Sequence, residues 1–233
     1  MSQSQQQQNS RRPPPTKQFR QLKFGTINIT TVREHSRLDD CVRLASSANL
    51  DIVALQETKR RGVEAKTVRR TENGKQVVYE FYGRGYKRAP PKDESLAGVG
   101  FLVRKSQFIT VEDVNDDLGP RMLSATILAF GIRYFMINNY MFTETASRPV
   151  GLSAVDYAKK VDSIAKKKDR QYQLLRKTIK DRPKKARLIV LGDFNATSTV
   201  ASSYTRHRGN NPISDAHTAN DNGTRMLDVV RQI

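Results

Sequence analysis

The sequence predicts one mixed α/β domain built from packed layers of strands and helices. Two features support this prediction. A strand, a helix and a strand open the folded part of the chain, and a helix, a strand and a helix close it, with several short strands between them. The chain has 233 residues, of which 37% are apolar, so it is long enough to bury a substantial core.

The chain begins with a segment, residues 1–21, that we expect to be a disordered basic arm. Gln5–Gln8 is a homopolymer, Pro13–Pro15 is a stiff turn, and the segment contains no acidic residue. Such a composition cannot bury enough apolar surface to become ordered. The folded domain is therefore expected over residues 22–233.

The first half of this domain is expected to be mostly strands, with one early helix. Residues 22–29 predict a strand, and Ser36 and Asp39 form a capping box before an apolar stripe of helical spacing. The apolar run Ile52–Leu55 is typical of a strand buried on both faces. Residues 59–75 are highly charged, and we expect a surface loop or an irregular helix there. Further strands are predicted at residues 77–82, 99–103, 108–111, 122–130 and 134–140.

A long helix is predicted in the second half of the domain. Ser153 and Asp156 form a second capping box, Pro183 ends the helix, and apolar side chains at 161, 164, 172, 175 and 179 share one face. Residues 188–191 predict another buried strand. Apolar residues from Met226 to Ile233 again have helical spacing, and the chain stops there without Gly, Pro or a polar cap, so we expect the domain to be truncated at its C-terminus.

The charge of the chain favours a polyanionic partner. Lys and Arg number 41 against 23 acidic residues, a formal net charge of +18. Residues 159–187 hold 13 basic residues against 3 acidic ones, and residues 59–92 hold 11 against 3. These segments suit binding to the phosphate backbone of DNA, although a lysine-rich helix face can also be merely solvated.

Other features exclude several classes of protein. The single cysteine, Cys41, excludes a disulfide scaffold and a multi-cysteine zinc site. It fits an intracellular, reducing compartment. For a DNA-binding protein, we expect that compartment to be the nucleus. No apolar run reaches the roughly 18 residues of a membrane span, and residues 1–24 lack the apolar core of a secretory signal. No obligate protein partner is evident.

Polar side chains follow three of the predicted strands. Asn28 ends the first, Glu57 follows the second, and Asp193 and Asn195 follow the third. Because the carboxyl ends of strands gather at one rim in layered α/β folds, these side chains are expected to converge. Carboxylates and carboxamides suit Mg²⁺ or Mn²⁺ and do not suit zinc. Each residue by itself could instead be an ordinary polar strand cap.

The strings Gly25–Ile29, Leu55–Lys59 and Gly192–Ala196 resemble the endonuclease/exonuclease/phosphatase (DNase-I-like) superfamily, and most closely the endonuclease domain of non-LTR retrotransposons and their apurinic-endonuclease-like relatives. The segments 98–101, 120–123 and 222–228 also resemble that group. The resemblance implies a two-sheet mixed β-sandwich flanked by helices. It also implies phosphodiester hydrolysis of DNA that depends on Mg²⁺ or Mn²⁺.

The same resemblance implies a role for each matching residue. Glu57 would be the principal metal ligand, with Asn28 beside it. Asp193 would orient or deprotonate the attacking water, Asn195 would donate to a phosphate oxygen, and Tyr140 would contact the scissile phosphate or the leaving group.

Three basic residues are expected to bind the substrate, namely Lys59, Arg121 and His207. The resemblance also implies a final element that carries an Asp and a His and follows the helix containing residues 222–228. This sequence stops within that helix, so we expect the activity to be impaired. The string Ser214–His217 precedes the last helix and has one residue too many to replace that element. A catalytically dead DNA-binding remnant and a phosphatase of the same superfamily remain as alternatives.

Overall fold

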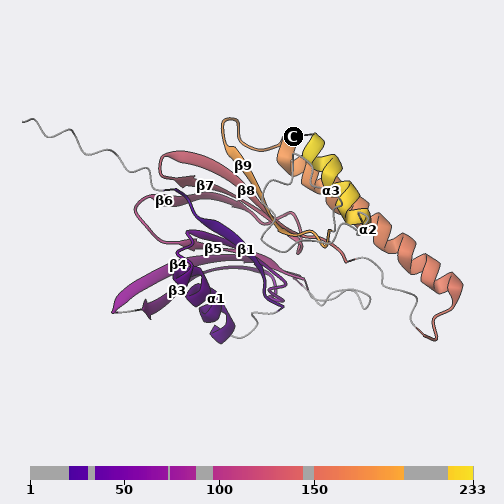
Figure 1. The fold of residues 1–233 in the computed structure, drawn as a ribbon, viewed down its shortest axis with the longest axis horizontal. Helices are drawn as coiled ribbons and strands as arrows, with labels where there is room; N and C mark the ends of the chain where they lie inside the picture. The colour runs from indigo at the N-terminus through magenta and orange to yellow at the C-terminus, as the bar shows by residue number, and fades with distance from the viewer. Residues whose placement is uncertain are drawn as a thin grey trace, which may run out of the picture.

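Two β-sheets lie face to face between helices in the computed structural model (Figure 1). The structure describes residues 21–30, 35–72, 74–87, 97–143, 150–196 and 220–232. This arrangement confirms the predicted mixed α/β sandwich with helices on its outer faces. Nearly all of the expected N-terminal arm lies outside the described residues.

The first sheet has the strand order β1-β2-β5-β4-β3. Its strands are β1 (Phe24–Asn28), β2 (Ile52–Gln56), β3 (Val63–Glu72), β4 (Lys75–Arg84) and β5 (Val99–Arg104). β1 and β2 are parallel, and the other neighbours are antiparallel. Helix α1 (His35–Ser47) covers the outer face, where Leu38, Val42 and Ala45 are buried against the sheet. The predicted apolar stripe is therefore the packed face of α1.

The second sheet has the order β6-β7-β8-β9. Its strands are β6 (Ile109–Asn115), β7 (Met122–Ala129), β8 (Ile132–Tyr140) and β9 (Arg187–Asp193). β8 and β9 are parallel because helix α2 (Ala154–Lys180) connects them as a crossover. α2 and the last helix, α3 (Asp221–Arg231), cover the outer face of this sheet (Figure 1). Apolar side chains from both sheets, such as Phe101 and Ile127, fill the space between the sheets.

The highly charged segment before β4 is a strand, so the prediction of a loop or irregular helix over residues 59–75 was wrong. Strand β3 pairs with β4 along its whole length and lies at the edge of the first sheet. Its charged side chains are stabilised by local ion pairs, including Glu64 with Arg60 and Lys66. Val68 is buried beneath α1, and the paired residues run from Val63 with Arg84 to Glu72 with Lys75. Charge along an edge strand is compatible with β-structure because the outer edge faces water.

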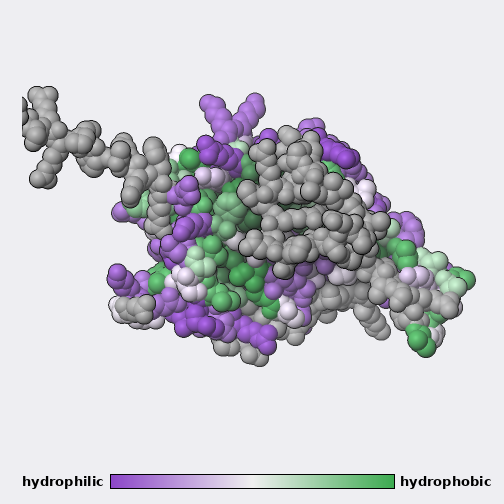
Figure 2. Space-filling model, in the orientation of Figure 1, coloured by the Kyte–Doolittle hydropathy of each residue, from purple (hydrophilic) through white to green (hydrophobic). Residues whose placement is uncertain are grey.

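Helix α2 begins and ends close to the predicted positions. Ser153 is the N-cap and accepts a hydrogen bond from the backbone N–H of Asp156, as the capping box predicts, and Asp181 is the C-cap. Burial begins only at Lys168, so Val161, which was expected on the buried face, is 38% exposed. The first half of α2 extends beyond the sheet, and Figure 2 shows hydrophobic side chains on the surface at that end. Among the described residues, no helix combines the length and hydropathy needed to cross a membrane.

Candidate active site

The carboxyl ends of four strands meet at one edge of the sandwich. β1 and β2 are a parallel pair in the first sheet, β8 and β9 are a parallel pair in the second, and β1 packs against β9. The residues at or just after these four ends are Asn28, Glu57, Tyr140 and Asp193. The expected convergence of Asn28, Glu57 and Asp193 is thus what the geometry shows.

One amide nitrogen joins the two carboxylates. The Nδ2 of Asn28 donates to Oε1 of Glu57 at 2.9 Å and to Oδ2 of Asp193 at 2.8 Å. The Oδ1 of Asn28 accepts from the backbone N–H of Thr30 at 3.2 Å, which fixes the side-chain orientation. Asn28 therefore holds a carboxylate from each sheet next to the other, and its own oxygen is turned away from them.

Tyr140 lies beside Glu57 and stays protonated. Its hydroxyl donates to Oε1 of Glu57 at 2.9 Å. Burial, reinforced by this hydrogen bond, raises the pKa of Tyr140 to about 12. The Arg121 guanidinium lies 4.8 Å from the centre of the Tyr140 ring and 4.1 Å from that of Phe142. Because Arg121 is only 6% exposed, it supports Tyr140 from beneath the surface.

The turn after β9 shapes the other half of the site. Gly192 has φ +141°, and a Cβ there would lie 1.9 Å from the backbone oxygen of Asn139, so only glycine fits. The backbone N–H of Asn195 donates to Oδ1 of Asp193 at 2.9 Å, which orients that carboxylate. The side-chain Nδ2 of Asn195 donates to the carbonyl of Met141 at 2.9 Å and ties the turn to the end of β8.

Three residues of the site have left-handed backbone conformations that are uncommon for residues other than glycine. Glu57 has φ +55°, Lys59 has φ +51° and Asn195 has φ +48°. Such conformations persist where the surrounding hydrogen bonds over-determine them, and they are concentrated at functional sites. The segments that follow β2 and β9, which carry the carboxylates, therefore both contain uncommon backbone conformations.

A family profile for the endonuclease/exonuclease/phosphatase family matches residues 25–230, which include all of these residues. The chain belongs to this family. No curated protein matches the chain in sequence.

A search of solved structures finds proteins similar to this endonuclease/exonuclease/phosphatase domain at low identity. The endonuclease domain of TRAS1, a telomere-specific non-LTR retrotransposon, is 14% identical with a TM-score of 0.43, over 91% of this chain and 70% of that one. The AP endonuclease LMAP from Leishmania major is 13% identical with a TM-score of 0.45, over 91% and 66%. TDP2 from D. rerio, complexed with a single-strand DNA product, is 15% identical with a TM-score of 0.40, over 76% and 62%. This domain thus spans about three fifths of the TDP2 chain.

Of the three residues expected to bind the substrate, one lies at the site, one is buried and one lies outside the described residues. Lys59 lies at the site, with Nζ 4.0 Å from Oε2 of Glu57. Lys59 also lines a cavity of about 360 Å³ together with Arg60, Arg61 and Glu64, so three of the four lining residues are basic. Arg121 is buried, as described above, and His207 lies outside the described residues, as does the string 214–217.

Buried amides that support the site were not recognised in the sequence. Asn138 on β8 is fully buried between the sheets and bonds to Gln56, the residue before Glu57. Asn222 at the start of α3 is also fully buried and bonds to the turn after β9. The only signal for the second was the family-like string 222–228, which gave no indication of which residue mattered.

Proposed function

We propose that this domain hydrolyses phosphodiester bonds in DNA with the help of Mg²⁺ or Mn²⁺, as a retrotransposon-type endonuclease. The observation that carries the proposal is the shared hydrogen bonding of Asn28 to Glu57 and Asp193. Two carboxylates from different sheets are held against one amide at the rim, next to a protonated phenol. Paired carboxylates of this kind are what cation binding or proton transfer requires, and this supports the proposal.

The residues present fit a hard divalent cation. Among the described residues, Lys59 is the basic side chain within ion-pair distance of these carboxylates, with Nζ 4.0 Å from Oε2 of Glu57. Oxygen ligands of this kind suit Mg²⁺ and Mn²⁺. Glu57 would hold the ion, with Asn28 fixing the Glu57 carboxylate. A bound ion would supply positive charge against the phosphate oxygens.

The remaining chemistry is assigned to the side chains of the chain itself. Asp193, oriented by the Asn195 backbone N–H, accepts the proton of the attacking water. Tyr140 stays protonated at neutral pH, because burial raises its pKa to about 12, and its O–H, which donates to Glu57 in this structure, would turn to the phosphate or the leaving oxygen of a bound substrate. An amide NH₂ has two N–H groups, so Asn195 keeps one for a phosphate oxygen while the other bonds to Met141.

DNA is the substrate that the charge of the chain favours. The net charge is +18, and the cavity beside the site is lined by Lys59, Arg60 and Arg61. Such groups contact phosphates and carry no sequence information, so we expect binding that is largely independent of sequence and strongly weakened by salt. A DNA substrate also implies a nuclear place of action.

Plasmid nicking in Mg²⁺ tests the proposal. We expect Glu57→Gln and Asp193→Asn each to lower the nicking rate by about 10²- to 10⁴-fold, with EDTA abolishing it. Glu112→Gln is the matched control, since Glu112 is an exposed carboxylate paired with Arg133 on the second sheet. Nicking that survives both EDTA and Glu57→Gln would contradict the proposal.

Two other outcomes would identify the alternatives. Salt-sensitive retention of DNA on a gel without any nicking would mean that the chain is a DNA-binding remnant. Release of phosphate from soluble inositol phosphates without DNA affinity would mean that it is a phosphatase.

A further inference from the structure

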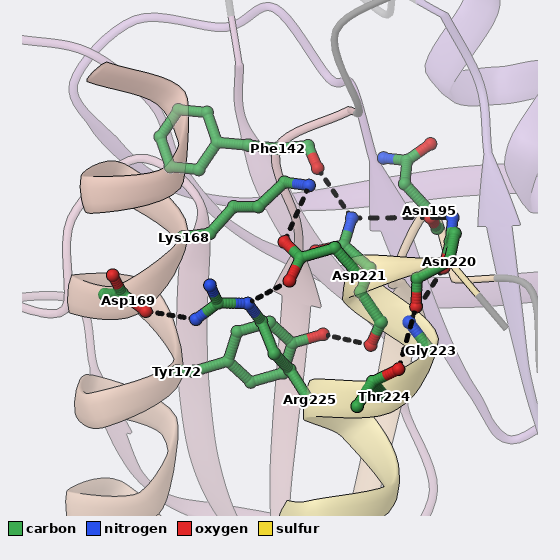
Figure 3. Close-up of polar contacts among 11 residues, drawn as sticks. Phe142, Lys168, Asp169, Tyr172, Asn195, Asn220, Asp221, Gly223, Thr224 and Arg225 are labelled. Atoms are coloured by element: carbon green, nitrogen blue, oxygen red, sulfur yellow. Dashed lines mark hydrogen bonds and ion pairs between the residues drawn. The ribbon is translucent and has the colours of Figure 1, made fainter. Parts of the chain in front are cut away.

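Helix α3 begins with two asparagines whose side chains point at the candidate active site. Asn220 is the N-cap, and its Oδ1 accepts from the backbone N–H of Gly223 at 2.8 Å. Its Nδ2 donates to the backbone oxygen of Asn195 at 2.9 Å (Figure 3). Asn222 is fully buried, and its Nδ2 donates to the backbone oxygens of Phe142 at 2.9 Å and of Asn195 at 3.3 Å.

The two carbonyls that accept from Asn222 belong to different strand ends. Phe142 follows β8, two residues after Tyr140, and its ring packs on the Arg121 guanidinium that also covers the Tyr140 ring. Asn195 follows β9, two residues after Asp193, and its backbone N–H orients the Asp193 carboxylate. One amide of α3 therefore joins the loop that follows the phenol to the turn that follows the carboxylate.

The start of α3 is itself held firmly by α2. Tyr172 is buried and donates to the backbone oxygen of Asn222 at 2.9 Å. Lys168, also buried, pairs with Asp221 at 3.2 Å, and Arg225 pairs with both Asp221 and Asp169 (Figure 3). Burial alone would raise the pKa of Asp221, but the hydrogen bonds from Arg225 and Lys168 outweigh it and lower that pKa. A helix start fixed in this way is a rigid anchor.

We propose that Asn222 is a positioning residue for the Asp193–Asn195 turn, and that Asn220, which donates to the same carbonyl, assists it. The role in catalysis rests on the proposed function. Asn222 touches neither Asp193 nor Glu57, and it acts by fixing the peptide of Asn195 and the carbonyl of Phe142 at a set separation. Without it, the turn keeps its covalent connection to β9 and the hydrogen bond from Asn220, but it loses its link to the loop after β8.

The first test measures the turn itself and needs no activity. Amide hydrogen exchange over residues 193–196 is expected to rise by at least about tenfold in Asn222→Ala, while the core strands remain protected. Val229→Ala is the matched control, because Val229 is a buried residue of the same helix that packs on α2 and the second sheet. If the two variants show the same exchange in the turn, Asn222 has only a packing role and the proposal is wrong.

The second test measures catalysis. We expect kcat for DNA nicking to fall by about 10- to 100-fold in Asn222→Ala with KM nearly unchanged, because the carboxylate is displaced and the DNA-binding surface is not. Val229→Ala should leave kcat within about twofold, since a small loss of stability does not alter the folded site. A wild-type chain without nicking would remove the proposed function and leave the exchange result to decide on Asn222 by itself.

A milder variant covers the case in which Asn222→Ala fails to fold. Asn220→Asp keeps an acceptor for the Gly223 N–H, because Asp is an equally good N-cap, but removes the donor to Asn195. We expect exchange over residues 193–196 to rise about threefold or more, in the same direction as for Asn222→Ala. Unchanged exchange in a folded Asn220→Asp protein would overturn the proposal.

Discussion

Asn138 provides the sharpest test of how the two sheets are held together behind the site. Its Nδ2 donates to the backbone oxygens of Leu55 at 2.9 Å and Gly100 at 2.8 Å, both in the first sheet. Its Oδ1 accepts from Nε2 of Gln56 at 2.7 Å. Because Gln56 directly precedes Glu57, this buried amide connects β8 to the strand that carries the proposed metal ligand. We expect Asn138→Ala to be strongly destabilising.

The magnitude follows from the three hydrogen bonds that disappear. Each hydrogen bond contributes about 1 kcal/mol net, and the buried amide of Gln56 loses this acceptor. The free energy of unfolding should therefore fall by at least about 3 kcal/mol. For a chain of this size, a loss of 1 kcal/mol lowers Tm by roughly 2–4 °C. The variant should therefore melt about 6–12 °C below the wild type. Its urea midpoint should fall while the slope of the unfolding transition stays constant.

The control is an asparagine at the surface of the second sheet. Asn115 is exposed, and its Oδ1 accepts from the nearby backbone N–H of Asp117, so Asn115→Ala should lower the free energy of unfolding by at most about 0.5–1 kcal/mol. Equal losses of stability for Asn138→Ala and Asn115→Ala would show that the inter-sheet amide does not hold the sheets together, and the reasoning would fail.

Two further predictions concern ionisable groups. Since the pKa of Tyr140 is raised to about 12, ionisation of the phenol should not lower the nicking rate up to about pH 10. Tyr140→Phe should lower the rate at every pH. A wild-type rate that falls from pH 8 to 9, with no such fall in the variant, would contradict this prediction. Burial raises the pKa of Cys41 to about 11, so a thiol reagent should modify this thiol only as fast as the protein opens. The free energy of unfolding should also decline between about pH 9 and 11, because the Cys41 thiol ionises there only in the unfolded chain. Rapid modification in the native state would show that Cys41 is accessible.

The layered fold was predictable because its signals are local and repeated. The apolar run Ile52–Leu55 is fully buried in β2, as a run without alternation predicts. The capping box at Ser153 gave the start of α2 to the residue. Strand β3 was not predictable in the same way, because charged residues dominate it and its pairing with β4 depends on a neighbour. Propensity is a weak guide for an edge strand whose stability comes from cross-strand pairs.

The site was predictable only in part, for a related reason. Asn28, Glu57 and Asp193 were found because each follows a recognisable strand, and strand ends have a common location in layered folds. Asn138 gave no signal, because a buried polar residue in the string Ile137–Tyr140 looks like the end of an ordinary strand. Asn222 could not be interpreted, because its acceptors lie 80 and 27 residues away in the chain.

The two missed asparagines explain why the carboxylates can be close at all. Glu57 belongs to one sheet and Asp193 to the other, so their separation depends on the packing of the whole sandwich as well as on their own strands. Asn138 fixes the position of β8 relative to β2, and Asn222 fixes the turn after β9 relative to the loop after β8. Each buried amide has to satisfy its hydrogen bonds in one arrangement only, which makes it a more exact spacer than an apolar contact. Hydrogen bonds from neutral amides hold the two carboxylates at a fixed separation, and this is the preorganisation that the proposed function requires.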